Sequence, residues 1–294
     1  MVVEPLIVAL LLLAALMHAS WNALLKSDPS DRLATFGVMM TAGTVMGLCF
    51  VPFLPWIEPA AWKYLVASIL IHVLYYTFLL KAYSYGDLSH TYPIARGLGP
   101  LLVAFVSGRL IGEHLRAQDI LGVVLLSCGL VALAMPLKAA VPRPGSRHGL
   151  ATLFAVLTGF TVAAYLIADG LGVRSAGPTF QHRLAYIAWL CVLEGPWLLM
   201  LAILLRPHKV WTHLRGNWWR GVIGGVIANV GYGIAIYALV LGPMAHVAAL
   251  RETSVLFGAL IGTLLLGEPF GVRRVAAALV IVVGLLMMNG PQLL

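Results

Sequence analysis

The chain has 294 residues, of which 61% are hydrophobic and only 10% are charged, and its mean hydropathy is +0.95. A water-soluble domain of this composition would have too few ionic groups to cover its surface, so the sequence predicts an integral membrane protein. The net charge of +8 would favour nucleic-acid binding in a soluble chain. Here the basic residues fall between apolar runs, which is typical of topology signals, and we expect no nucleic-acid partner.

Apolar runs separated by charged and turn residues predict ten transmembrane helices. Each run is close to the roughly 20 residues that the hydrocarbon core of a bilayer requires. The first run is expected to stay in the protein as a span, because no small-residue cleavage site follows it. The predicted spans are residues 6–25, 34–54, 64–85, 90–111, 119–136, 149–169, 180–204, 219–241, 246–266 and 274–290.

The expected linkers are residues 137–148 and 205–218, and the first of them divides the ten spans into two groups of five. We expect residues 1–136 and 149–294 to be two five-helix repeats. Because five is an odd number, the second repeat enters the membrane from the opposite side. Inverted repeats around a central cavity are the arrangement that alternating-access transporters use.

Polar residues repeat between the two halves at a nearly constant offset. The pair Gly112-Glu113 after the fourth span matches Gly267-Glu268 after the ninth at an offset of 155. Lys and Arg are more frequent in the loops after odd-numbered spans, which places both termini outside by the positive-inside rule. The sequence therefore predicts an internal duplication and gives an orientation for it.

Three features together resemble a known superfamily. They are ten helices in two repeats, the Gly-Glu pair that closes the fourth and ninth spans, and residues 15–26, which read Ala-Leu-Met-His-Ala-Ser-Trp-Asn-Ala-Leu-Leu-Lys. Over essentially the whole chain these features resemble the drug/metabolite transporter superfamily, and within it the EamA-type exporters, which include aromatic amino-acid exporters. The resemblance implies a multi-pass carrier of the inner (plasma) membrane with a central cavity. One departure is Pro269, which follows Glu268 where His114 follows Glu113.

Ionisable residues inside the predicted spans mark the expected cavity. A charge at mid-membrane costs about 2.5 kcal/mol or more on insertion scales, so each one needs a partner or water. Such residues are Arg96 in the fourth span, Glu194 in the seventh, and Arg251 and Glu252 in the ninth. The arginines either bind substrate or satisfy carbonyl groups at a broken helix, and Pro93 predicts a bend or break in the fourth span.

Polar and aromatic side chains at helical spacing give several spans one polar face. Tyr76 in the third span and Tyr232 in the eighth are related by an offset of 156, so we expect them to line one cavity from both sides. The alternative for such aromatics is the membrane interface, where Tyr and Trp are enriched. The candidate substrate-binding residues are Tyr76, Tyr232, His72, Trp189, Arg251, Arg96, Glu194, Glu252, Asn22, His18 and Tyr165.

The chemistry of these side chains favours export of a small zwitterionic or aromatic metabolite, with amino acids first. Arg96 or Arg251 would bind a carboxylate and Glu194 or Glu252 an ammonium group. The alternatives are efflux of organic cations, which the aromatic faces would bind, and a membrane scaffold or enzyme subunit without transport.

We find no phosphate-binding Gly-rich loop and no metal-ligand spacing. The sequence thus predicts no enzyme, no catalytic residue, no metal and no cofactor, with a small molecule and the lipid bilayer as partners. We expect a monomer, with a homodimer as the alternative.

Overall fold

The computed structural model describes residues 4–27, 31–85, 88–134, 147–266 and 271–289, and within them all regular structure is helical. The helices before the predicted linker 137–148 are α1 (Pro5–Ser27), α2 (Arg32–Phe50), the short 3₁₀ helix η1 (Val51–Phe53), α3 (Pro59–Tyr85), α4 (Leu88–Leu110) and α5 (Ala117–Ala134). Those after it are α6 (His148–Arg174), α7 (Phe180–Leu205), α8 (Pro207–Gly216), α9 (Trp218–Leu241), α10 (Met244–Arg251), α11 (Ser254–Leu266) and α12 (Val272–Asn289).

Each predicted span coincides with one α-helix, except the second, which also includes η1, and the ninth, which forms two α-helices. The helix stops at Arg251 and a new one starts at Ser254, so the backbone is broken beside Glu252. The break predicted at Pro93 is wrong, because α4 is continuous there. Pro93 is the sixth residue of α4, beyond the first turn in which a helix tolerates proline best, so a bend at this position stays a prediction. The linker predicted at 205–218 is also not a loop, since it folds as α8.

Long apolar helices confirm a multi-pass helical membrane protein. In the described part of the chain, seven stretches are long and apolar enough to cross a bilayer, namely Pro5–Leu25, Leu33–Phe53, Pro59–Tyr85, His148–Arg174, Phe180–Leu205, Trp218–Leu241 and Met244–Leu264. The other long helices, α4, α5 and α12, are shorter or more polar, so the count of ten crossings stays a prediction. Large apolar side chains such as Leu70, Leu204 and Leu264 point outward, where lipid would contact them.

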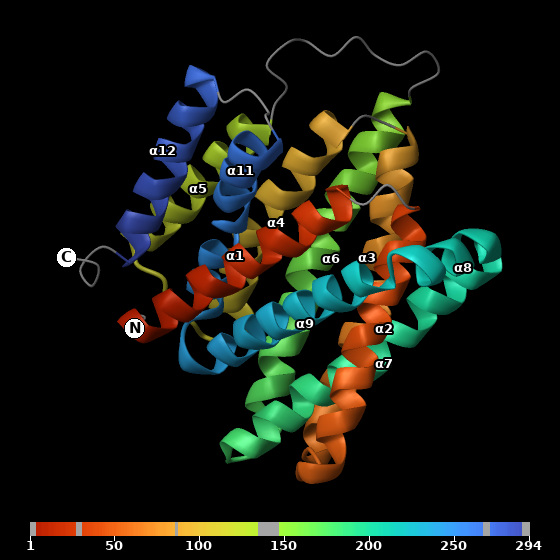
Figure 1. Cartoon of the computed structure of the whole chain (residues 1–294). Helices are drawn as coiled ribbons and strands as arrows, with labels where there is room; N and C mark the ends of the chain where they lie inside the picture. The colour runs from red at the N-terminus through yellow and green to blue at the C-terminus, as the bar shows by residue number, and fades with distance from the viewer. Residues whose placement is uncertain (1–3, 28–30, 86–87, 135–146, 267–270, 290–294) are drawn as a thin grey trace.

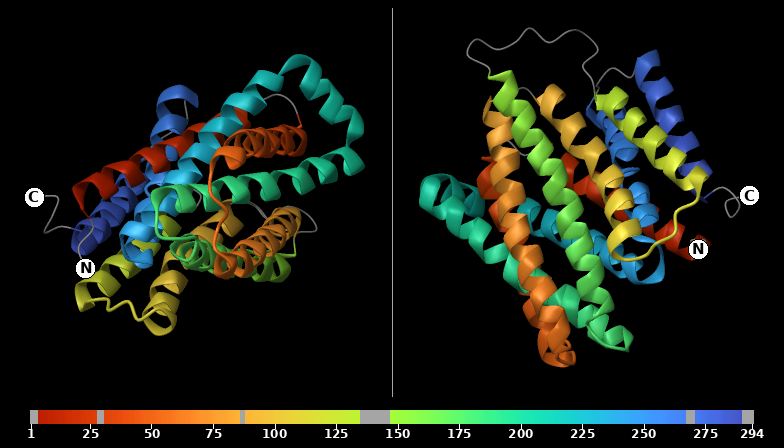
Figure 2. Two further views of the ribbon diagram at one scale, coloured as in Figure 1. Left: turned by 90° about the horizontal axis from the view of Figure 1, so that it is seen from below. Right: turned by 180° about the vertical axis from the view of Figure 1, so that it is seen from behind.

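The helices pack in the same pattern in both halves. α3 packs against α6 as α9 packs against α1, and α4 packs against α6 as α11 packs against α1. Two pairs of equivalent helices also contact each other, α2 with α7 and α5 with α12. Figure 1 shows α1 and α9 side by side across the front of the molecule, and the rear view in Figure 2 shows α3 and α6 behind them. Exchanging the two halves therefore maps the main helix contacts onto one another.

Equivalent helices run antiparallel where they touch. A Cβ atom added at Gly47, near the end of α2, would lie 2.6 Å from the carbonyl oxygen of Ala188, near the start of α7. One added at Gly37, near the start of α2, would lie 3.2 Å from the Cα of Leu199, near the end of α7. α5 and α12 cross in the same antiparallel sense. Glycine permits this close approach because it has no side chain.

Candidate functional site

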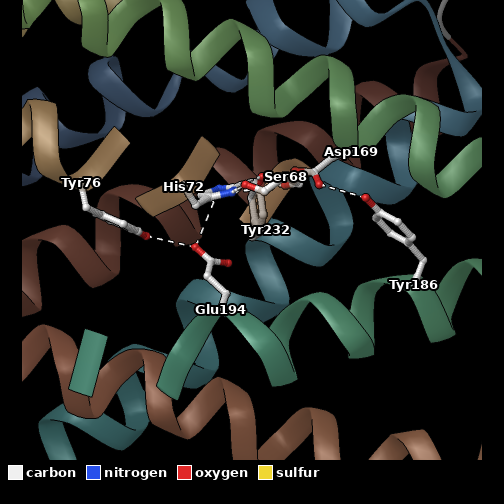
Figure 3. Close-up of polar contacts among 7 residues, drawn as sticks. All are labelled: Ser68, His72, Tyr76, Asp169, Tyr186, Glu194 and Tyr232. Carbon is white, nitrogen blue, oxygen red and sulfur yellow. Dashed lines mark hydrogen bonds and ion pairs between the residues drawn. The ribbon is translucent and has the colours of Figure 1, made fainter. Parts of the chain in front are cut away.

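Four helices bring polar side chains together inside the apolar bundle (Figure 3). We call this group the His72 cluster. It consists of Ser68, His72 and Tyr76 from α3, Asp169 from α6, Tyr186 and Glu194 from α7, and Tyr232 from α9. Asp169 is 0% exposed, His72 4% and Glu194 8%. Burial this deep requires that each polar group find a partner, and the cluster supplies them.

The two carboxylates of the cluster are each held by tyrosine hydroxyl groups. Tyr76 Oη donates to Glu194 Oε1 over 3.1 Å. Tyr232 Oη donates to Asp169 Oδ2 over 2.6 Å, and Tyr186 Oη donates to Asp169 Oδ1 over 3.2 Å. These donors compensate part of the cost of removing the carboxylates from water.

The imidazole of His72 lies between the two carboxylates. Its Nε2 atom is 3.8 Å from Glu194 Oε1 and 3.5 Å from Tyr232 Oη. Its Nδ1 atom is 2.9 Å from the backbone carbonyl oxygen of Ser68, one helical turn earlier. The ring stacks on Tyr165 with centroids 4.2 Å apart, which fixes its plane. His72 therefore joins α6, α7 and α9 through one side chain of α3.

A small cavity adjoins the cluster at the break between α10 and α11. We call it the arginine cavity. Besides small residues of α1 and α9, it is lined by His18, Arg96, Tyr232, Arg251, Glu252 and Ser254. Its volume is about 20 Å³, room for one or two water molecules. Tyr232 belongs to both sites, because its hydroxyl group reaches Asp169 while the guanidinium of Arg251 lies 5.0 Å from the centre of its ring.

Arg96 holds one side of the arginine cavity. Its Nη1 atom is 3.4 Å from Glu252 Oε1, and its Nη2 atom is 3.3 Å from both Ser254 Oγ and His18 Nε2. Two other buried atoms, Arg251 Nη1 and Glu252 Oε2, have no hydrogen-bond partner among the described residues. Two residues that line the cavity thus each have a polar atom without a partner in the described chain, one on a cation and one on an anion, and Glu252 is only 5% exposed. A ligand carrying both charges would satisfy the two groups at once.

Most of the predicted site residues fall in these two places. The His72 cluster contains or contacts His72, Tyr76, Tyr165, Glu194 and Tyr232, and the arginine cavity is lined by His18, Arg96, Tyr232, Arg251 and Glu252. The two tyrosines related by the repeat do not meet in one cavity here. Tyr232 lines the arginine cavity, whereas Tyr76 reaches Glu194 on the other side of His72.

Two predicted residues lie elsewhere. The ring of Trp189 is 5.4 Å from those of both Trp56 and Trp62, in a separate group of indoles near η1. Asn22 is exposed, and its Nδ2 atom donates to the carbonyl oxygen of His18 in the same helix. Helical spacing fixed the depth of these residues along the chain but not the neighbour that each one faces.

Sequence reasoning gave no role to Asp169, which is the most deeply buried acid of the cluster. The sequence places it on the polar face of the sixth span, residues 149–169, as the last residue of that span, and it is not among the candidate site residues. α6 continues five residues further, to Arg174, and this extension moves Asp169 into the interior. The apolar residues that follow Asp169, including Leu171 and Val173, were the signal that could have found it.

A bundle of long apolar helices with ionisable side chains in its interior is typical of an integral membrane protein, in which such side chains mark candidate solute or ion sites. Over residues 5–135 and again over 149–290, the chain matches the EamA-like transporter family. The chain belongs to this family, within the drug/metabolite transporters, and the resemblance found in the sequence is confirmed. The EamA-like family is a family of membrane transporters of the drug/metabolite type.

Two individual proteins extend the comparison. The uncharacterized protein PA1977 of Pseudomonas aeruginosa is 30% identical over 194 residues, which is 64% of this chain and 60% of that protein. A solved crystal structure has a TM-score of 0.74 and 19% sequence identity, and the match covers 98% of this chain and 96% of that one. At this identity the second likeness shows the fold alone. Neither protein indicates a substrate.

Proposed function

We propose that this chain is a secondary transporter that exports small zwitterionic metabolites, amino acids first, across the inner membrane by alternating access. The observation that carries the proposal is that Arg251 and Glu252 both line the arginine cavity, and that each has a buried atom, Arg251 Nη1 and Glu252 Oε2, without a hydrogen-bond partner in the part of the chain that the structure describes. An α-amino acid carries a carboxylate and an ammonium group on the same carbon. The carboxylate would bind Arg251 and the ammonium group Glu252, each through a charge-assisted hydrogen bond.

Aromatic side chains next to the cavity favour an aromatic or other apolar substrate side chain. The ring of His18 lies 5.1 Å from Trp21, Trp21 lies 5.8 Å from Phe36, and Phe36 lies 5.4 Å from Tyr76. Such rings offer edge and face contacts to a substrate ring. A cavity of about 20 Å³ is too small for any amino acid in this conformation. Substrate then enters only when the surrounding helices separate.

The same proposal includes ten membrane crossings and inverted repeats, residues 1–136 and 149–294. The exchange of helix contacts between the halves and the antiparallel packing of equivalent helices support it. Tyr85 and Leu241 end the equivalent helices α3 and α9. In a variant without native cysteines, a membrane-impermeant maleimide should label Tyr85→Cys and Leu241→Cys from opposite sides. Labelling from the same side would contradict the inversion.

The transport proposal is tested with purified protein in proteoliposomes and two panels, the amino acids and a set of organic cations. We expect counterflow of at least one amino acid and a loss of more than tenfold in Arg251→Ala. Arg251→Lys should retain part of the flux if a point charge suffices. His208→Gln on the exposed face of α8 is the matched control and should transport normally. Absence of amino-acid counterflow would refute the proposal.

Efflux of organic cations is the second candidate function. It is favoured by the excess of buried acids, since the two sites hold Asp169, Glu194 and Glu252 but only Arg96 and Arg251. A cation would add one positive charge and could lie against the tyrosine rings. Flux in the cation panel without flux in the amino-acid panel would select this function.

A further inference from the structure

Both ring nitrogens of His72 face hydrogen-bond acceptors. The carbonyl oxygen of Ser68, 2.9 Å from Nδ1, can only accept, so Nδ1 carries a hydrogen. Nε2 faces Glu194 Oε1 and Tyr232 Oη. The hydroxyl hydrogen of Tyr232 is already donated to Asp169 over 2.6 Å, so its oxygen presents lone pairs to His72. Only the doubly protonated imidazolium matches acceptors on both sides.

The other histidine beside the cavity has the opposite environment. His18 Nε2 lies 3.3 Å from Arg96 Nη2, and a guanidinium can only donate. His18 must therefore accept at Nε2, which requires a neutral ring. A proton added there would replace an attraction to Arg96 with repulsion. The geometry thus assigns different protonation states to two histidines of the same interior.

A proton on His72 also balances the charge of the buried interior. The His72 cluster and the arginine cavity together hold three carboxylates, those of Asp169, Glu194 and Glu252, against two guanidiniums. One further positive charge makes the set neutral, and His72 is the group placed to carry it. Excess charge in a low-dielectric interior is costly, so the neutral set is the stable one. The other groups that face His72 are the hydroxyl group of Ser68, whose Oγ lies 3.3 Å from Nδ1, and the rings of Tyr75, Tyr76 and Tyr165.

We propose that His72 binds the coupling proton of this carrier and that Tyr232 links the proton to the substrate. This inference rests on the proposed transport function. Tyr232 contacts His72 and Asp169 through its hydroxyl group, while its ring lies under the guanidinium group of Arg251 in the arginine cavity. A substrate carboxylate that draws Arg251 off this ring frees Tyr232 to move away from His72. The Nε2–H bond of the imidazolium then breaks, its electron pair stays on nitrogen, and water takes the proton.

The proposal fixes the stoichiometry and the electrical behaviour of transport. One proton bound on one side of the membrane is exchanged for one zwitterion released there. A zwitterion carries no net charge, so each cycle moves one positive charge across the bilayer. A pH gradient and a membrane potential should both drive export, and removing the proton site should leave substrate exchange without this drive.

The first experiment reads the protonation of His72 without any substrate. Purified protein is labelled with ¹³C and ¹⁵N histidine, and the His72 signals are assigned from their absence in His72→Gln. Doubly protonated chemical shifts at pH 7 are expected, with loss of the second proton in Glu194→Gln. A neutral single tautomer at pH 7 in the wild-type protein overturns the proposal. This result is independent of whether any panel compound is transported.

The second experiment uses an amino acid that shows counterflow in the panel. An inward proton gradient should accelerate its export from proteoliposomes at least tenfold in wild-type protein. In His72→Gln the gradient should have no effect while counterflow persists, and His208→Gln should match the wild type. Tyr232→Phe keeps the ring and removes only the hydroxyl group, so it should also lose the gradient response if His72→Gln fails to fold. A gradient response retained in His72→Gln or Tyr232→Phe overturns the proposal, whereas absent counterflow refutes the transport function itself.

Discussion

The acid of the first Gly-Glu pair caps a helix of the other half, and removing it should destabilise the carrier measurably. Glu113 is 8% exposed, and its two carboxylate oxygens accept from the backbone N–H of Met244, at 2.9 and 3.0 Å. Met244 is the first residue of α10. Arg174 Nη2 lies 3.4 Å from the same carboxylate. A carboxylate at this position accepts from the backbone N–H of Met244, which has no partner within α10, and its negative charge is attracted to the positive end of the helix dipole.

The magnitude follows from these contacts. Loss of a helix cap costs about 1 kcal/mol, and loss of a hydrogen bond to a charged group costs about 1.5–3 kcal/mol. Both describe the same bonds, so we expect Glu113→Ala to lose about 2–3 kcal/mol in total. The substitution does not leave the buried part of the Arg174 guanidinium without a partner, because Arg174 also donates to the carbonyl oxygens of Leu239 and Gly242 at 2.8 and 3.0 Å. The larger cost of an unpaired buried charge is therefore not added. For a chain of this size the melting temperature should fall by about 5–10 °C.

The assay is thermal unfolding in detergent, followed by tryptophan fluorescence. Glu58→Ala is the matched control, because Glu58 is exposed and its backbone N–H bond to Ala176 survives the change. Glu113→Gln keeps an acceptor oxygen without the charge and should fall between Glu113→Ala and the wild type. A Glu113→Ala protein that melts with the wild type would refute the reasoning.

Two further predictions concern other parts of the fold. A Cβ at Gly122 would lie 2.6 Å from the carbonyl oxygen of Gly284, so Gly122→Val should separate α5 from α12 and lower the melting temperature, whereas Gly258→Ala, where nothing lies within 4 Å, should not. Outside the spans, burial alone would raise the pKa of Asp31, but backbone N–H groups of α2 and the Arg206 guanidinium outweigh it and hold the pKa below 3.8. Because the folded-state pKa is lowered, this stabilisation is complete at neutral pH and is lost as the pH falls below about 4. Melting temperatures from pH 6 to 3 should therefore fall less in Asp31→Asn than in the wild type.

The helical spans could be predicted because long apolar runs leave few alternatives in a membrane. The places where a helix is interrupted could not be predicted from the sequence. Pro93 is the residue type that usually interrupts a helix, yet the interruption lies beside Glu252, in a stretch with neither proline nor glycine. There the packing of α10 against α4 and α1, together with the ion pair between Arg96 and Glu252, decides the backbone path. Such contacts join residues far apart in sequence, so the helix propensity of a local segment does not predict them.

The candidate site was predictable to the extent that charge inside an apolar span is costly. That rule found Glu194, which lies in the His72 cluster, and Arg96, Arg251 and Glu252, which line the arginine cavity. It missed Asp169, because the rule depends on where a span is taken to end. It also could not separate Trp189 from the site, since depth along a helix does not say which neighbour a side chain faces. The second Gly-Glu pair, with Glu268, lies outside the described residues, so its equivalence to Glu113 stays a prediction.

The central claim is that Arg251 binds the carboxylate of an amino acid and Glu252 binds its ammonium group. The most direct measurement is calorimetric binding of phenylalanine, phenylalaninamide and phenylethylamine to the purified protein. These compounds share the ring and the amine, and only phenylalanine has the carboxylate. The account predicts that phenylalanine binds at least tenfold more tightly than the other two and that Arg251→Ala abolishes this preference. Equal or tighter binding of phenylethylamine would contradict it.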